Sequence, residues 1–596
     1  MKTLSALDIE VLPNYFLLVL KSTRTGKIKQ YELFGENKRF SKDEIRSIKS
    51  LLTKYTSFGF NSINYDMPLI NYVLMGATPQ QLYKVSKDII ENRKKAYFIY
   101  TEYEITKNNF DHFDLIEPSP AVMVSLKTYG TRLGSKKLKE FYLDPHEPIN
   151  EAMLDEFRAY CVNDVDTTID LYNAIKDRIS LREDMMQQYD GIVDLRSKSD
   201  PQVAEAIFKY KLNLRSAKPD KVPTSITYKA PDYITFRNPE LNKLKELMET
   251  HPIPVNQNNG QPKLPTEWNK YLKPKIGNTV YKIGLGGIHS QEKQLVVEAN
   301  NNYVLRNADI ASMYPSIILE LGLYPKSLGK KFLNVYRDIY NTRLEAKHNG
   351  DKATNAGLKI ALNGSYGKFG SKYSFLYAPH LMLSVTLTGQ LMMLMLIEEL
   401  EDRGFSVVSS NTDGIEVYCE RDRESEFETI VFDWELTTGM NMEHGSYLGL
   451  YARDVNNYVA KYDGYVKAKG AYTETSLMKG RSTPIVATAV REFINSGKSM
   501  EDTIKECKDV NEFIAARNVK GGGCYKDKHI GKTVRWYYSL DGDTINYCSN
   551  GNKVAKTGEG NGVKPIMDLF DAIPDDLDYQ WYFDEAVKLL NDLGVK

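Results

Sequence analysis

Hydrophobic residues in the first 180 positions alternate between short strand-like runs and longer runs with helical spacing. This pattern predicts an α/β region. At the N-terminus, Asp8 and Glu10 interrupt an apolar run, and no small-residue cleavage site follows it. We therefore expect a pair of buried strands here rather than a signal peptide.

The rest of the chain divides by pattern. Residues 215–280 are rich in Pro, Asn and Lys, which predicts a loop-rich connector or a surface insertion. Residues 280–475 have the densest strand–helix alternation and most of the polar motifs. Beyond them the pattern is irregular, and GGGC at 521–524 and the Gly- and Asn-rich stretch 549–565 predict flexible loops. Residues 578–594 predict an amphipathic helix that stops at a glycine.

Composition adds limits on class and partners. A chain of 596 residues is too long for one hydrophobic core, so we expect about three to five domains or subdomains. We see no run of about 18 apolar residues and expect no membrane span. Lys plus Arg and Asp plus Glu both number 78. Zero net charge is weak evidence against a nucleic-acid partner, because metal-binding carboxylates would offset a basic groove. The 40 tyrosines suit base stacking, but core packing explains most of them equally well.

The cysteines are scattered along the chain, without a CxxC pair or a Cys/His cluster. This distribution argues against a zinc site and against a disulfide framework. A reducing cytoplasm is the simplest expectation. The five cysteines are Cys161, Cys419, Cys507, Cys524 and Cys548.

Acidic residues recur in three places in the first third of the chain. Asp8 and Glu10 lie two apart in a strand-like segment, so they share one strand face, where two divalent cations would relieve their repulsion. Such a pair also occurs by chance. Asp66 follows a turn that it could simply cap, and Tyr160 could be a core residue. Tyr160 and Asp164 have the i, i+4 spacing that places both on one helix face.

Together, D-x-E at Asp8, N-x4-D from Asn61 to Asp66 and Y-x3-D from Tyr160 resemble the three motifs of DnaQ-like 3′→5′ exonucleases. The resemblance covers roughly residues 4–175. It implies an RNase H-like domain in which Tyr160 orients the attacking water. Asp114 lies where the family often has another acid, and we leave it outside the site. The implied ligands of two metal ions are Asp8, Glu10, Asp66 and Asp164.

The segment 302–325 predicts a strand that ends at Asp309, followed by a short helix. An acid at the end of a buried strand is costly without a partner, and the turn at Ser312 exposes backbone N–H groups that suit a phosphate. The stretch DIASMYPSII resembles motif A of family B DNA polymerases at nearly every position. The resemblance implies Asp309 as a metal ligand. It also implies Tyr314 as the steric gate that packs beneath the sugar and excludes a 2′-hydroxyl.

Two basic helix faces follow. Arg343 and Lys347 are spaced i, i+4, and alone they would fit a solvated surface. Lys359, Asn363 and Tyr366 are spaced i, i+4, i+7 on one face and resemble motif B, which usually follows such an R-x3-K pair. The resemblance implies that Arg343, Lys347 and Lys359 neutralise a triphosphate together with two metals. Lys359 would protonate the leaving pyrophosphate, and Asn363 and Tyr366 would border the nascent base pair.

Residues 405–420 predict a β-hairpin, for which Asp-Gly is an ordinary turn. Their position also suits motif C of the same polymerases, Y-x-D-T-D-S. This chain departs from that motif, since Asn411 replaces the first Asp and Gly414 replaces the Ser. The second Asp is kept as Asp413, the essential metal ligand by resemblance. We expect activity to survive, without any role that needs a charge at 411.

Flanking segments and spacing refine the resemblance. YKIGLGGIHSQ at 281–291 resembles the Y-x-G-G motif that helps pass the primer end between sites. Tyr458 and Lys469 lie where the family has its primer-gripping K-x-Y motif, and we expect them to touch primer phosphates. Asp309 and Lys359 are 50 residues apart, which leaves no room for the insertions of protein-primed phage polymerases. We infer that the chain does not start from a terminal protein and needs partners for long synthesis. It looks most like a bacteriophage replicative enzyme.

The resemblance implies an α/β and α+β multidomain chain, with an RNase H-like exonuclease domain followed by a right-hand polymerase. The expected divisions are the exonuclease at 1–180, a connector or N-terminal part of the palm at 181–280, palm at 281–325, fingers at 326–374, palm again at 375–475, and thumb with the C-terminal region at 476–596.

The implied function is primer-dependent DNA synthesis from dNTPs by two-metal nucleotidyl transfer, with 3′→5′ proofreading. Two Mg²⁺ ions per active site are expected, with Mn²⁺ able to substitute. Expected partners are primed DNA and dNTPs, with a processivity factor, helicase or single-strand-binding protein as candidates and no membrane. The expected location is the cytoplasm, that of the host if the chain is viral.

Three alternatives remain. In the first, the chain is a 3′→5′ exonuclease with a degenerate or partner-dependent polymerase half, although Asp309 and Asp413 are both present. In the second, it is a reverse transcriptase or a primase-polymerase. Bulky Tyr314, the exonuclease motifs and the lack of a zinc motif weigh against that reading. In the third, it is a non-catalytic DNA-binding scaffold, which would not need so many separately placed acidic and basic residues.

Overall fold

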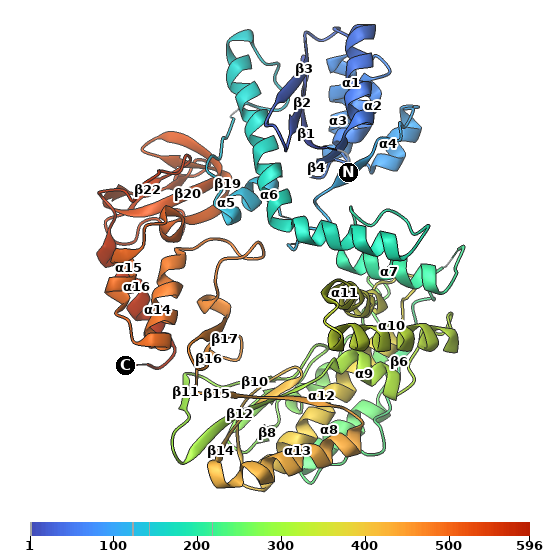
Figure 1. Cartoon of the computed structure of the whole chain (residues 1–596), viewed down its shortest axis with the longest axis vertical. Helices are drawn as coiled ribbons and strands as arrows, with labels where there is room; N and C mark the ends of the chain where they lie inside the picture. The colour runs from blue at the N-terminus through green and yellow to red at the C-terminus, as the bar shows by residue number, and fades with distance from the viewer. Residues whose placement is uncertain (1–2, 122–123, 142, 217, 596) are drawn as a thin grey trace.

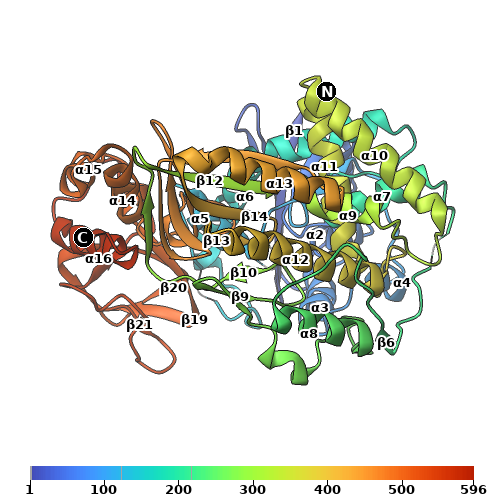
Figure 2. The same ribbon diagram turned by 90° about the horizontal axis from the view of Figure 1, so that it is seen from below.

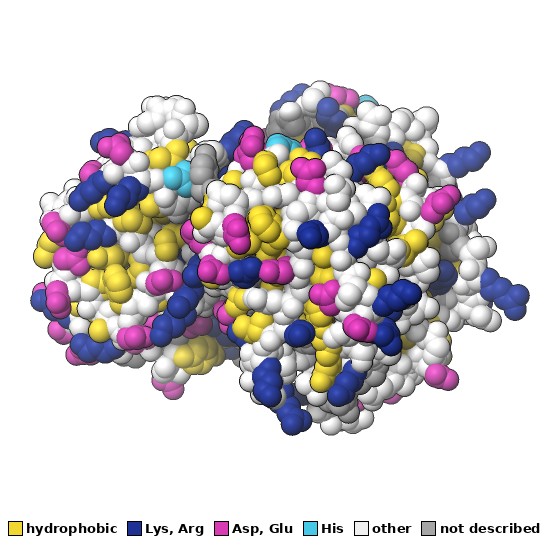
Figure 3. Space-filling model, turned by 90° about the horizontal axis from the view of Figure 1, so that it is seen from above, with side chains coloured by type: hydrophobic (Ala, Val, Ile, Leu, Met, Phe, Trp, Pro, Cys, Tyr) yellow, Lys and Arg dark blue, Asp and Glu magenta, His cyan; other side chains and the backbone are white. Residues whose placement is uncertain are grey.

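The computed structural model describes residues 3–121, 124–141, 143–216 and 218–595. The chain is a mixed α/β multidomain protein whose parts follow one another around a ring in Figure 1. The N-terminal sheet lies at the top, helices α7, α10 and α11 at the right, a seven-stranded sheet at the bottom and the C-terminal elements at the left. Basic and acidic side chains are interspersed over the face in Figure 3, in keeping with zero net charge.

The N-terminal region is a five-stranded sheet in the order β3-β2-β1-β4-β5. Its β1–β2 pair confirms the expected buried strand pair. Alternation along β1 sends Leu7 and Ile9 into one apolar cluster and Ala6 into another, which also contains residues of α6. The elements are β1 Leu4–Leu12, β2 Tyr15–Ser22, β3 Ile28–Phe34, α1 Lys42–Lys54, β4 Thr56–Gly59, α2 Asp66–Val73, α3 Pro79–Ile90, α4 Ala96–Glu102, β5 His112–Asp114, α5 Leu126–Leu133 and α6 Leu154–Gln188.

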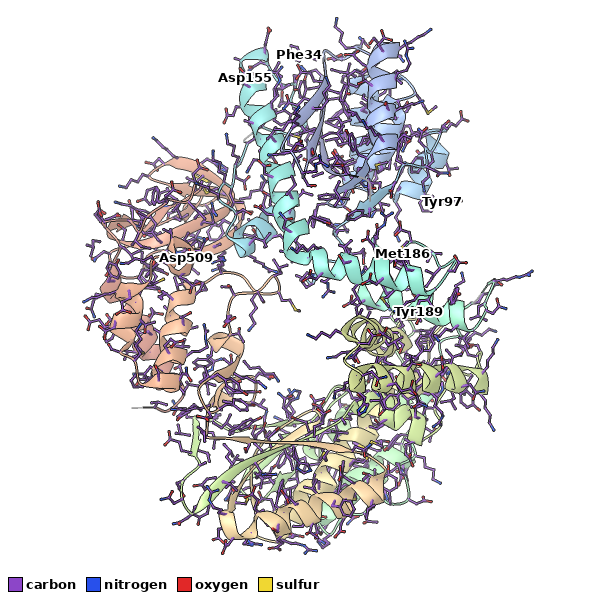
Figure 4. The ribbon with its side chains drawn as sticks, viewed as in Figure 1. Phe34, Tyr97, Asp155, Met186, Tyr189 and Asp509 are labelled. Atoms are coloured by element: carbon purple, nitrogen blue, oxygen red, sulfur yellow. A yellow bond between two sulfur atoms is a disulfide. The ribbon has the colours of Figure 1, made fainter. Side chains whose placement is uncertain are left out.

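Helix α6 connects this region to the middle of the chain. It has 35 residues, which corresponds to about 52 Å. Its last turns, where Figure 4 labels Met186, run toward α7 and α11, and the labelled Tyr189 directly follows the helix. A Cβ at Gly357 of α11 would lie 3.2 Å from the Met185 side chain, so the two helices are closely packed.

The central region is built on a seven-stranded sheet, β15-β12-β14-β13-β10-β9-β8, with α12 and α13 packed against one face (Figure 2). Its elements are α7 Asp200–Lys211, β6 Ser225–Ile226, α8 Pro239–Thr250, β7 Ile253–Pro254, β8 Lys275–Ile276, β9 Thr279–Lys282, β10 His289–Ser290, β11 Leu295–Glu298, β12 Tyr303–Ile310, α9 Met313–Glu320, α10 Lys330–His348, α11 Lys352–Phe369, α12 Pro379–Asp402, β13 Ser406–Asn411, β14 Gly414–Glu420, α13 Glu424–Thr438, β15 Met442–Tyr447, β16 Gly449–Asp454, β17 Asn457–Lys461 and β18 Val466–Lys469.

In this region one of two alternatives is excluded, and one expectation fails. Residues 215–280 are no surface insertion, because α8, Tyr228 and the fully buried Trp268 belong to the main core. Helix α12 contains an apolar window of 18 residues, contrary to the expectation that the chain has none. Of that window 78% is buried inside the protein, as expected for a core helix.

The C-terminal region combines a four-stranded sheet, β21-β19-β20-β22, with three helices. The amphipathic helix expected at the end of the chain is α16, and Gly594 behind it has a left-handed φ of 83°. The GGGC stretch, expected to be a flexible loop, lies inside strand β19. The elements are α14 Pro484–Ser496, α15 Met500–Glu506, β19 Ala515–Tyr525, β20 Lys528–Asp543, β21 Asn546–Tyr547, β22 Val563–Pro565 and α16 Tyr579–Asp592.

The cysteine prediction is wrong at one pair. Cys524 on β19 and Cys548, which directly follows β21, form a disulfide across 24 positions of sequence. Their spacing gave no signal, because the pairing follows from the register of β19 against β21, in which Cys524 lies opposite Asn546. Cys161, Cys419 and Cys507 are free thiols.

Closing a loop of this length restricts the unfolded chain, so the disulfide is expected to stabilise the C-terminal region by about 3 kcal/mol. Cys548→Ser, or reduction of the wild type, should lower the denaturant midpoint of that region by a corresponding amount, followed by tryptophan fluorescence. Cys507→Ser is the matched control and should leave the midpoint unchanged. A wild-type midpoint that does not respond to reductant would contradict the pairing.

Candidate active sites

Four acidic residues from three elements meet beside the N-terminal sheet; we call Asp8, Glu10, Asp66 and Asp164 the N-terminal carboxylate cluster. Asp8 and Glu10 project from the face of β1 opposite Leu7 and Ile9. Asp66 is the first residue of α2, and its Oδ1 accepts a hydrogen bond of 3.2 Å from the backbone N–H of Ile9. Asp164 is the eleventh residue of α6.

Burial and mutual repulsion make the fully ionised cluster unfavourable on its own. The pKa of Asp8 is raised well above its ordinary value by burial, then by Asp66 and Glu10. Burial and then Asp164 raise the pKa of Glu10 to about 8. The pKa of Asp66 also rises to about 8, through burial and then Asp114. Hard oxygen ligands crowded in this way suit divalent cations, so the residues present fit a metal site.

A lysine lies at the edge of the cluster. Lys127 on α5 donates a hydrogen bond of 3.0 Å from Nζ to Oδ1 of Asp164 and one of 2.7 Å to the backbone carbonyl of Lys139. The same ammonium group is 4.2 Å from the ring centroid of Tyr160. The pKa of Tyr160 is raised, first by burial and then by Glu10, so its phenol is protonated at neutral pH. Lys127 belongs to no motif that the sequence offered, and only folding brings it here.

Two further side chains clarify the limits of this site. Cys161 is fully buried, and its Sγ lies 3.8 Å from Oδ2 of Asp8 and within 4.8 Å of a carboxylate oxygen of Glu10. Asp114 instead accepts hydrogen bonds from the backbone N–H groups of Asn61 and Ile63, at 2.8 and 2.9 Å. It holds the turn before α2, which supports leaving it outside the site.

A separate pair of acids lies at the end of the central sheet; we call Asp309 and Asp413 the central carboxylate pair. Asp309 is near the end of β12, with Gly414 opposite it on β14 and Glu443 opposite it on β15. Asp413 occupies the turn between β13 and β14, as the predicted hairpin required. The backbone N–H of Ile310 donates to the carbonyl of Asp413 at 2.7 Å, which joins the strand to the turn.

Negative charge is concentrated around the central carboxylate pair. The pKa of Asp309 is raised by partial burial, then by Asp413. Glu416, on the same strand as Gly414, has a pKa raised to about 8 by burial, Asp309 and Glu292. Lys469 is the cation that opposes these shifts at Asp309, Asp413 and Glu416. The sequence motifs did not indicate Glu416 or Glu443, because only strand pairing brings them beside Asp309.

The two departures from motif C have a structural reason. A Cβ at Gly414 would collide with Oδ1 of Asp309, so a glycine leaves the space that this carboxylate occupies. The amide of Asn411 donates from Nδ2 to the carbonyl of Val455 at 3.4 Å and accepts from Oγ1 of Thr412 at 3.2 Å. An aspartate at position 411 could not donate that first hydrogen bond.

Basic residues of α10 reach the central sheet. Arg343 donates from Nη1 to Oγ of Ser312 at 2.8 Å, and Ser312 has a left-handed φ of 52° that turns the chain into α9. Lys347 pairs with Glu443, Nζ to Oε1, at 2.9 Å. These contacts place two cations beside the end of β12.

The predicted motif B residues lie on α11. The ring of Tyr366 packs against that of Tyr314, with centroids 4.4 Å apart. Lys359 and Asn363 are exposed on the same helix, and within the described residues neither has a hydrogen bond to the central carboxylate pair. The structure therefore brings Tyr314 and Tyr366 together and leaves Lys359 and Asn363 open to solvent.

The flanking motifs pack around the turn that carries Asp413. A Cβ at Gly287 would collide with the side chain of Thr412. The backbone N–H of Thr412 donates to the backbone carbonyl of Ile288 at 2.8 Å. Tyr458 and Lys469 lie directly opposite each other on β17 and β18, with the ammonium group 5.7 Å from the ring centroid. The GLGG and K-x-Y segments thus border the pair from two sides.

Comparisons with known proteins give a limited similarity. No protein-family model matches the chain. DNA polymerase 1 of Saccharolobus solfataricus is 27% identical over 163 residues, which are 26% of this chain and 17% of that protein. A family B DNA polymerase from the hyperthermophilic archaeon Pyrobaculum calidifontis aligns with 100% of this chain and 78% of its own, at 14% identity and a TM-score of 0.41.

Gly414→Ala is expected to displace the Asp309 carboxylate and to lower the rate of any reaction at the central carboxylate pair by about 10²-fold. Reactions at the N-terminal carboxylate cluster should be unaffected. The measurement is the rate of primer extension beside the rate of single-strand degradation. Gly480→Ala is the matched control, because nothing lies within 4 Å of a Cβ there. Full primer extension by Gly414→Ala would contradict the steric argument.

Proposed function

We propose that the chain is a primer-dependent DNA polymerase of the family B type with its own 3′→5′ exonuclease. The observation that carries the proposal is the strand arrangement that joins Asp309 to the turn bearing Asp413, with Arg343 and Lys347 beside it. The similarity of a 163-residue segment to a DNA polymerase supports it. A second, separate carboxylate cluster in the N-terminal region supports the exonuclease.

For synthesis, Asp309 and Asp413 would hold two Mg²⁺ ions, which would activate the primer 3′-hydroxyl and neutralise the triphosphate. Arg343 lies beside Ser312, so both can bind triphosphate oxygens at the start of α9. Lys359 is exposed on α11 and would protonate the leaving pyrophosphate. Tyr314, packed against Tyr366, limits the room beneath the sugar and favours dNTPs over NTPs.

For editing, Asp8, Glu10, Asp66 and Asp164 would hold two divalent ions that lower the cost of forming hydroxide and stabilise the leaving oxygen. Tyr160 remains protonated at neutral pH and can donate a hydrogen bond to a water or phosphate oxygen. Lys127 neutralises part of the charge at Asp164 and holds that carboxylate in place.

The arrangement supports proposed roles for the regions of the chain. Residues 1–180 form the exonuclease domain, 181–280 a connector or the N-terminal part of the palm, 281–325 and 375–475 the palm, 326–374 the fingers, and 476–596 the thumb with the C-terminal region. The proposed partners are primed DNA and dNTPs, with a processivity factor, helicase or single-strand-binding protein as further candidates.

Primer extension on a primed template with Mg²⁺ and four dNTPs tests the proposal, with Asp413→Ala and Asp8→Ala as reciprocal variants. Asp413→Ala should lower the rate of primer extension by about 10³-fold or more and leave the rate of single-strand degradation unchanged. Asp8→Ala should do the reverse.

Degradation by the wild type without any extension would contradict the polymerase assignment and favour an exonuclease with a degenerate or partner-dependent second half. Extension that survives in Asp413→Ala would show that the central carboxylate pair is not the catalytic site.

A further inference from the structure

A cavity of about 910 Å³, which we call the interdomain cavity, lies beside the N-terminal carboxylate cluster. One wall comes from the N-terminal region and includes Lys127, Tyr160 and Asp164. The other wall comes from strand β20 of the C-terminal region and includes Lys532 and Thr533. A cluster residue therefore shares its cavity with a segment more than 350 positions away in sequence.

The two walls are held together by specific contacts. The backbone N–H of Thr533 donates to Oε1 of Glu140 at 3.2 Å, and a Cβ at Gly531 would collide with the Glu140 side chain. Arg535, only 1% exposed, donates from Nη1 to the carbonyl of Ser135 at 2.6 Å. Its other donors reach the carbonyls of Ile566 and Met567. Burying a guanidinium is costly unless its hydrogen bonds are made. The three carbonyl partners of Arg535 therefore hold the two regions in one specific arrangement.

The same contacts lead to the N-terminal carboxylate cluster. Lys139, next to Glu140, accepts the Lys127 ammonium group on its carbonyl, and its own N–H donates to Oδ1 of Asn163 at 2.7 Å. Asn163 precedes Asp164 on α6. The segment against which β20 docks is therefore the segment that positions Lys127 against Asp164.

The chemistry of the lining suits a strand of nucleic acid. Cations stand on both walls, Lys127 and Lys139 on one and exposed Lys532 on the other. The rings of Phe141 and Tyr160 also line the cavity, and their centroids are 6.1 Å apart. Ammonium groups contact phosphates, and aromatic rings accept bases without sequence preference. Four acids also line the cavity: Asp164 belongs to the proposed metal site, Glu140 is engaged by Thr533, and Glu156 and Asp568 are exposed. Within the described residues none of the four forms an ion pair with Lys532, so this ammonium group is available for a phosphate.

We infer that Lys532 of the C-terminal region binds a backbone phosphate of the DNA strand whose 3′ end lies at the proposed exonuclease site. The inference rests on the proposed exonuclease function and extends it. The exonuclease cleft is completed by a residue of the C-terminal region, so the N-terminal region alone does not form the whole binding site.

The test uses the full-length chain and compares wild type, Lys532→Ala and Lys528→Ala. Lys528 is the matched control, because it is an exposed lysine on the same strand outside the cavity lining. Binding of a fluorescent single-stranded DNA oligonucleotide is measured by anisotropy with EDTA present, across a range of salt concentrations. The KM and kcat for degradation of that strand with Mg²⁺, and extension of a fully paired primer, are measured beside it.

Lys532→Ala is expected to weaken single-strand binding and raise KM by about five-fold, with a salt slope smaller by about one and kcat unchanged. Extension of the paired primer and all values for Lys528→Ala should match the wild type. Equal affinity and equal salt slope for Lys532→Ala and wild type would overturn the inference. A wild type that binds the strand but does not degrade it would contradict the exonuclease, while the two lysine variants would still decide the role of the cavity.

Discussion

Repulsion between carboxylates held close together on a rigid backbone is the constraint on which both sites depend. In the N-terminal region β1 fixes Asp8 and Glu10 on one face, and the hydrogen bond from Ile9 to Asp66 brings a third acid to the same place. In the central region, three paired strands and the backbone hydrogen bond from Ile310 to Asp413 hold Asp309 and Asp413 close together. Because neither arrangement can relax by moving the backbone, the fully ionised carboxylates need cations beside them. Lys127 and Lys469 supply part of that charge, and divalent metals fit the remainder.

The ring of regions seen in Figure 1 gives this constraint a wider consequence. Helix α6 bears Asp164 in its first half and packs against α11 near its end, so one continuous helix connects the N-terminal carboxylate cluster to the helix that bears Lys359. On the other side, buried Arg535 fastens the C-terminal region to the segment that positions Lys127. Both sites therefore belong to one continuous framework, as expected if a single DNA strand is to visit both.

Much of this framework could be predicted from local pattern. Period-two and i, i+4 spacing correctly placed Asp8 with Glu10 on a strand and Tyr160 with Asp164 on a helix, and the hairpin around Asp413 followed from turn residues. Features that depend on strand pairing could not be predicted: Glu443 beside Asp309, and Cys524 bonded to Cys548. The GGGC stretch misled because glycine is frequent in loops, yet here it lies in a paired strand. Gly414 departs from the motif, and the sequence does not explain why. The structure does, because a Cβ at this position would collide with the Asp309 carboxylate.

The central claim is that one chain carries two independent phosphoryl-transfer sites that act on the same primer end. Its most direct test is idling turnover, measured as conversion of a labelled dNTP to dNMP on a primed template supplied with only the next correct nucleotide. The account predicts steady dNMP release that requires the template and disappears when either Asp309 or Glu10 is replaced by alanine. Primer extension by one nucleotide without any dNMP release would contradict it, because the two sites would then not share a substrate.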